Sequence, residues 1–181
     1  MQANVKIANE TRTVWIIDPT HTTVEFAVRK FFLFTVKGSI GTADGTITVD
    51  PADIRGSSVT ATLTSASIVT GNKRRDTHLR ASDFLEADKY PEIRFQSSKV
   101  EPGTDRDTLR VHGLLTIKNK SVEVILNVND IDRSCSPSGE QVAYYTALVE
   151  VDRHDFGVDA WRSLIGSKVQ ITINVQAIRQ M

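Results

Sequence analysis

The residues whose types are best suited to chemistry lie in one short stretch, from Arg75 to Arg80. Within it, Asp76 and His78 are a carboxylate and an imidazole two positions apart, and such groups could act together as an acid/base pair. Arg75 and Arg80 flank them and could bind an anionic head group. We favour the simpler interpretation that these charges form salt bridges and caps that fix a short helical segment against its surroundings.

Other catalytic signals are weak. The four histidines have neither the i, i+4 spacing nor the cysteine partners of a zinc site. The chain has no serine nucleophile elbow, Walker loop or dinucleotide-binding glycine pattern. Cys135, the single cysteine, lies among polar residues at 133–138, which is typical of an exposed loop. The sequence therefore predicts no metal site and favours a protein that is not an enzyme.

Composition indicates one ordinary globular domain. The chain has 181 residues, of which 40% are hydrophobic, and Lys+Arg and Asp+Glu both number 22. Without a basic excess, we expect no nucleic-acid partner. Residues 1–13 lack the apolar core of a secretory signal, and no run of ~18 apolar residues could span a membrane. We therefore expect a cytoplasmic protein with an N-terminal tail over 1–13 and a single barrel domain over 14–181.

Alternating apolar and polar residues dominate the chain and predict half-buried strands. The strongest runs lie at 24–28, 47–49, 59–63, 93–95, 109–117, 122–128 and 169–177. Roughly eight short strands with few helices between them favour a mainly β, antiparallel barrel or sandwich. Alternation alone does not decide between these two.

Breaks in the alternation predict the connections. Residues 43–45 and 118–120 fit tight hairpins. The stretch from Gly71 to Tyr90 is the main exception to the β pattern, with one or two helical turns expected at 75–81. The apolar run from Phe31 to Phe34 lies between two strands and is interpreted either as core or as an exposed lip.

The side chains expected to face inward include many Val, Ala and Gly residues. A barrel lined by small apolar side chains leaves an interior that stays dry and accepts apolar guests. The alternative is a sandwich whose two faces interdigitate and leave no volume.

Several motifs, in order along the chain, resemble the YceI-like family of polyisoprenoid-binding domain proteins. They lie at 15–22, 24–28, 36–38, 70–72, 75–84, 90–95, 113–117 and 155–158. The resemblance implies an eight-stranded antiparallel lipocalin-like barrel with a short helical insertion. It also implies that the barrel holds a long isoprenoid chain, such as a polyprenyl phosphate or the tail of an isoprenoid quinone.

We therefore predict that the protein binds a long apolar lipid inside the barrel and carries or stores it, with no cofactor beyond that lipid. Burial of each CH₂ contributes ~0.8 kcal/mol, and at ~0.3 kcal/mol per atom some tens of carbons would reach about nanomolar affinity. Arg75, His78 and Arg80 are the candidates for contacts with the head group. The predicted apolar contacts are Phe26, Val28, Val36, Ile47, Val59, Leu63, Phe84, Phe95, Leu115, Phe156 and Trp161.

Two other functions stay open at this stage. One is an enzyme that uses the cavity for acid/base chemistry by Asp76 and His78 on an apolar substrate. The other is a stress-related interaction module with residues 31–34 as its docking edge. The partners expected besides an isoprenoid lipid are a transiently contacted membrane and a second copy of the chain.

Overall fold

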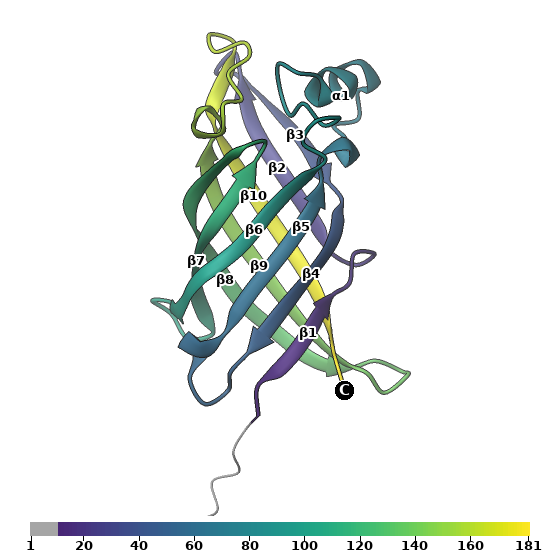
Figure 1. Ribbon diagram of the computed structural model, residues 1–181, viewed down its shortest axis with the longest axis vertical. Helices are drawn as coiled ribbons and strands as arrows, with labels where there is room; N and C mark the ends of the chain where they lie inside the picture. Colours follow the sequence, from purple (N-terminus) through teal and green to yellow (C-terminus); the bar gives the residue numbers. More distant parts are fainter. Residues whose placement is uncertain (1–10) are drawn as a thin grey trace, which may run out of the picture.

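The computed structural model describes residues 11–181, which form a tall antiparallel barrel with one α-helix at one end (Figure 1). The described residues contain ten strands. They are β1 (Thr13–Ile17), β2 (Thr23–Lys30), β3 (Phe34–Ile40), β4 (Thr42–Val49), β5 (Ser58–Thr64), β6 (Glu92–Pro102), β7 (Thr108–Ile117), β8 (Lys120–Cys135), β9 (Gln141–Asp152) and β10 (Ile165–Arg179).

Ten strands make eight positions around the barrel, because β1 and β2 share one position and β3 and β4 share the next. Both β1 and β2 pair with β10, β1 near the end of β10 and β2 along its first part. On their other side, β4 pairs with β1 and β3 pairs with β2. The remaining strands follow one another from β5 to β10. The prediction of an eight-stranded antiparallel barrel is therefore confirmed, and the sandwich is excluded.

The first and last strands close the barrel. Trp15 lies opposite Arg179 and Ile17 lies opposite Ala177 in the β1–β10 ladder. The Gln180 backbone N–H also donates to the Val14 carbonyl at 2.8 Å. This ladder leaves neither β1 nor β10 as an open edge, whereas the outer side of β3 is joined to the described residues only by the Ser39–Val69 bridge. β1 begins at Thr13, one residue before the expected start of the domain, and residues 1–10 of the expected tail lie outside the described part.

The hairpin expected at 43–45 is wrong. Asp44 and Gly45 belong to β4 and lie opposite Thr62 and Ala61 of β5. A Cβ at Gly45 would lie 2.5 Å from Ile17 Cδ1, so this glycine allows Ile17 to approach the strand closely. The hairpin at 118–120 is confirmed, since Ile117 pairs with Lys120 across a two-residue turn.

The insertion between β5 and β6 carries α1 (Lys73–Arg80), which confirms the expected helical turns. The Asn72 side chain caps the helix by accepting from the Arg75 backbone N–H at 3.0 Å. Three short 3₁₀ helices, η1 (Ile54–Gly56), η2 (Ser65–Ser67) and η3 (Arg153–Phe156), complete the secondary structure of residues 11–181. No helix in that range is long and apolar enough to cross a membrane.

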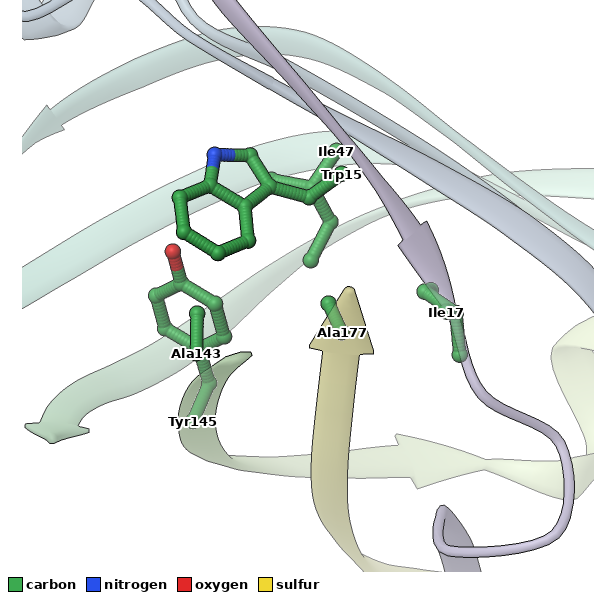
Figure 2. Packing of buried hydrophobic residues seen from close by; sticks show 6 residues of the cluster. All are labelled: Trp15, Ile17, Ile47, Ala143, Tyr145 and Ala177. Atoms are coloured by element: carbon green, nitrogen blue, oxygen red, sulfur yellow. The ribbon is translucent and has the colours of Figure 1, made fainter. Parts of the chain in front are cut away.

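Two clusters of buried side chains mark the two ends of the barrel. The helix end is the end where α1, the β2–β3 turn and the segment 157–164 lie, and the terminal end is where β10 finishes (Figure 1). A cluster at the terminal end contains Trp15, Ile17, Ile47, Ala143, Tyr145 and Ala177 (Figure 2). A second cluster, towards the helix end, contains Phe84, Val151, Phe156 and Val158. Phe84 belongs to the insertion between β5 and β6, and Phe156 belongs to η3 between β9 and β10. These two connections therefore cover part of the helix end.

Candidate functional site: the interior cavity

The barrel encloses a cavity of about 800 Å³ that runs from one end towards the other. Inward side chains from every strand position line it, and most of them are Val, Ile, Leu or Phe. The alternation that predicted the strands therefore also selects the wall, because every second residue faces the interior. The volume lies within the ~300–1,000 Å³ typical of small-molecule sites.

All of the residues predicted for the site line this cavity except Arg80. The lining includes Phe26, Val28, Val36, Ile47, Val59, Leu63, Arg75, His78, Phe84, Phe95, Leu115, Phe156 and Trp161. Their contact with a ligand stays a prediction. The structure does not bring Arg80 to the cavity, because its guanidinium turns back along the insertion and donates to the Ile68 carbonyl at 2.9 Å.

Two glycines widen the cavity by letting aromatic rings lie against the wall. A Cβ at Gly38 would lie 2.5 Å from Phe26 Cζ, and a Cβ at Gly113 would lie 2.6 Å from Phe95 Cζ. Each ring therefore lies against the backbone of the glycine, in the space that the side chain of any other residue at that position would fill. As a consequence, two large apolar side chains line the cavity without filling its centre.

Two polar groups of the cavity wall at the helix end, Arg75 and His78, come from α1. Arg75 donates to Thr70, from Nε to Oγ1 at 2.7 Å and from Nη2 to the carbonyl at 3.0 Å. His78 Nε2 lies 2.8 Å from Asp83 Oδ2, and this hydrogen bond lowers the pKa of Asp83. The His78 ring packs between Phe84 and Trp161, with centroids 5.0 and 5.2 Å away.

Asp76 and His78 do not form the acid/base pair considered above. The buried Asp76 carboxylate accepts from the Thr70 backbone N–H at 2.9 Å and from the Thr70 hydroxyl. His78 is bound to Asp83 instead. Both interactions tie the insertion together, as the structural interpretation of this charged stretch predicted.

At the terminal end, the sequence analysis missed a polar group that lines the same cavity. Residues 133–135 belong to β8 and not to a loop, although Cys135 is exposed as expected. The Arg133 guanidinium lies over the rings of Trp15 and Tyr145, 5.6 and 5.0 Å from their centroids. Its Nη2 donates to Tyr145 Oη at 2.9 Å and to Asp130 Oδ2 at 2.8 Å.

Burial raises the pKa of Tyr145, so its hydroxyl keeps its proton beside this ion pair. A register shift in the β8–β9 ladder between Asp130 and Asp132 places these polar side chains. The sequence carries no clear signal for such a shift.

Arg153 is a second residue that the sequence analysis did not single out. It is buried and donates to four backbone carbonyls: Val158 at 2.6 Å, Ala160 at 2.9 Å, and Ile165 and Gly166 at 3.0 Å. Val158 and Ala160 belong to the connection before β10, and Ile165 and Gly166 lie at the irregular start of β10, so these bonds satisfy carbonyls where regular strand pairing is lacking. Arg153 therefore fixes the segment that carries Trp161 over the helix end.

A closed antiparallel barrel with an apolar interior cavity defines a class of binding proteins that enclose a small ligand. Within residues 11–181, no group of three or more His, Cys, Asp or Glu side chains is arranged to hold a metal ion. The chain belongs to the YceI-like domain family, whose model matches residues 15–177. The resemblance noted from the motifs is therefore confirmed.

Similar proteins agree with this assignment. A UPF0312 protein of Vibrio cholerae is 28% identical over 169 residues, which cover 92% of this chain and 87% of the relative. The crystal structure of Burkholderia cenocepacia BcnA has a TM-score of 0.79 at 22% identity, covering 88% of this chain and 98% of that one. A polyisoprenoid binding domain from Saccharophagus degradans, implicated in plant cell wall breakdown, has a TM-score of 0.64 at 12% identity, covering 92% and 98%. At these identities, the two structures establish the shared fold alone.

Proposed function

We propose that the protein binds a long apolar lipid in the barrel and carries or stores it without changing it chemically. The cavity of about 800 Å³ with walls of aliphatic and aromatic side chains carries this proposal. An apolar cavity gives water few hydrogen-bond partners, so replacing that space with a hydrocarbon chain is favourable.

The cavity volume sets the length of chain that can be enclosed. If one methylene takes about the ~30 Å³ of a liquid water molecule, roughly 25 carbon atoms fit within 800 Å³. At ~0.3 kcal/mol per atom, they contribute about 7–8 kcal/mol, which corresponds to a micromolar Kd. This affinity is weaker than the nanomolar value expected from the sequence, because the cavity encloses only about 25 carbon atoms, and the rest of any longer chain would extend beyond the wall.

Family membership supports a polyisoprenoid as the cargo, either a polyprenyl phosphate or an isoprenoid quinone. Apolar walls sense the girth and length of a chain and do not form directional bonds with it. Selection of a head group then falls to the polar residues of the wall. At the helix end these are Arg75 and His78, together with Lys30 and Arg74.

The direct test is the identity of what the purified protein holds. Native mass spectrometry and solvent extraction should reveal a prenyl lipid, and protein stripped of lipid should take up solanesol from detergent solution. Phe26→Arg places an unpaired charge on the wall and should abolish that uptake, because a buried charge without a partner is strongly disfavoured.

The matched control is Glu25→Arg, which puts the same side chain on the exposed face of β2 one residue earlier. It should take up solanesol as the natural protein does. If folded Phe26→Arg protein took up solanesol normally, the interior would not be the binding site. If Phe26→Arg failed to fold, the uptake test would rest on the Ala147→Phe variant described below.

A further inference from the structure

The helix end carries a set of exposed apolar side chains, most of which do not line the cavity. We call this set the apolar lip: Phe31, Phe32 and Leu33 of the β2–β3 turn, Phe34 at the start of β3, and Trp161 and Leu164 of the neighbouring segment. Phe32, Leu33 and Phe34 are 81%, 83% and 64% exposed. The run at 31–34 is thus a lip and not core. Large apolar side chains gathered on one face of a protein are typical of a surface that binds a membrane or another protein.

Backbone contacts hold the two parts of the lip together. The Phe31 N–H donates to the Leu164 carbonyl at 2.9 Å, and the Leu164 N–H donates to the Trp161 carbonyl at 2.9 Å. The Trp161 ring also packs on His78, which joins the lip to α1. The two backbone segments that carry the lip therefore lie side by side at the helix end of the barrel (Figure 1).

Three aromatic residues of the lip adopt a backbone conformation that aromatic residues rarely adopt. Phe31, Phe32 and Trp161 have φ angles of 52°, 57° and 54°. This left-handed region is sterically unfavourable for bulky side chains, and Gly, Asn or Asp usually occupies it. All three side chains are exposed, so burial of the aromatic rings does not offset the free-energy cost of this backbone conformation. Strain of this kind commonly accompanies a functional surface.

Basic side chains flank the lip. Lys30 Nζ lies 5.1 Å from the centroid of the Phe31 ring, and Lys73 and Arg74 are exposed on the first turn of α1. Cations at the N-terminus of a helix oppose its dipole, so helix stability does not explain them there. Of the acidic residues at this end, Asp83 and Asp159 are bound to His78 and Arg162, whereas Asp88 and Asp155 are exposed. Aromatic and aliphatic side chains bordered by Lys and Arg suit the interface of a bilayer that contains anionic lipids.

The lip also adjoins the cavity, since Trp161 belongs to both, and the flanking Lys30 and Arg74 line the cavity as well. We propose that the helix end docks on an anionic lipid bilayer, with Phe32, Leu33 and Phe34 inserted among the head groups and acyl chains. This inference extends the proposed function: a cargo dissolved in the bilayer could enter the barrel without crossing water. The surface itself is argued from exposure and charge, independently of any cargo.

Sedimentation with lipid vesicles tests the docking. Protein stripped of lipid should bind vesicles of phosphatidylcholine with phosphatidylserine, bind phosphatidylcholine alone more weakly, and lose binding as salt is added. The double variant Phe32→Asp, Leu33→Asp should lower partition at least about tenfold, equivalent to about 1.4 kcal/mol. Asp tolerates the left-handed backbone of position 32, so the turn should survive.

The control is Ile131→Asp, Leu148→Asp, which removes exposed apolar side chains outside the lip. It should bind vesicles as the natural protein does. Equal binding by the lip variant and the natural protein would overturn the proposal, as would a natural protein that binds no vesicles. Self-association through the lip, lost in the lip variant and without vesicle binding, would overturn it as well.

Solanesol uptake from detergent, measured on the same variants, separates this inference from the proposed function. Vesicle binding without uptake would refute the cargo and keep the docking surface. Uptake without vesicle binding would refute the docking surface and keep the cargo.

Discussion

The substitution Ala147→Phe tests whether the interior is empty space available to a ligand. Ala147 lies in β9, lines the cavity and is 5% exposed, with Val128 and Ile173 opposite it on the two neighbouring strands. A phenyl ring at this position adds six carbon atoms to a wall that already faces a void. The ring should occupy the volume that about six carbon atoms of the lipid would take.

The cost to binding follows from the carbons displaced. At ~0.3 kcal/mol per atom the loss is about 2 kcal/mol, and at ~0.8 kcal/mol per CH₂ it is about 5 kcal/mol. The Kd for solanesol should therefore rise by about thirtyfold to several thousandfold. Stability should stay the same or increase, because filling an apolar void adds contacts and displaces no side chain.

Solanesol titration and thermal unfolding of the same samples give both quantities. Leu148→Phe is the matched control, since Leu148 is the next residue of β9, is 46% exposed and is absent from the cavity wall. It should leave the Kd unchanged. An unchanged Kd for folded Ala147→Phe would refute the cavity as the binding site. A loss of several kcal/mol of stability would show that Ala147 faces packed atoms.

Two further substitutions test the parts of the structure that hold the barrel ends. Arg153→Met leaves four backbone carbonyls without their donor and should lower the free energy of unfolding in urea by about 3–5 kcal/mol; a loss below about 1 kcal/mol would show that water replaces the guanidinium. Hydrogen bonds from Lys99 and His112 lower the pKa of Glu101 from 4.5 to about 2, so its ionised form stabilises the fold above pH 4.5 and that contribution is lost as the pH falls through 2. The stabilities of the natural protein and Glu101→Gln, measured against pH, should therefore differ most above pH 4.5 and converge towards pH 2, whereas a constant difference would assign the effect to packing.

The strands and the wall of the cavity could be predicted because one pattern determines both. In β10, Val169, Ile171, Ile173 and Val175 alternate with polar residues, and each of the four lines the cavity. Side chains of a strand point alternately to its two faces, so the core pattern and the lining pattern are the same. Helical turns at 75–81 could be predicted because the β alternation breaks there, whereas the start at Lys73 and its cap by Asn72 are known from the structure.

The features that could not be predicted depend on contacts between distant parts of the chain. Gly45 resembles a turn residue, but its role is set by Ile17, which approaches it from another strand. Arg133 resembles a loop residue, but a register shift places its guanidinium over Trp15 and Tyr145. Arg80 lies in the same stretch as Arg75 and yet points away from the cavity. The residues adjacent in sequence do not reveal such placements, because contacts with residues distant in sequence determine them.

The ladder between β1 and β10 has a consequence for synthesis on the ribosome. Trp15 and Ile17 leave the ribosome long before their partners Arg179 and Ala177, because the ladder joins distant parts of the sequence. Until β10 has been made, a nascent chain therefore has β1 and β9 as the open edges of its sheet, and such edges favour aggregation. The barrel can close only once β10 is available, so this contact of high sequence separation forms late and slows folding.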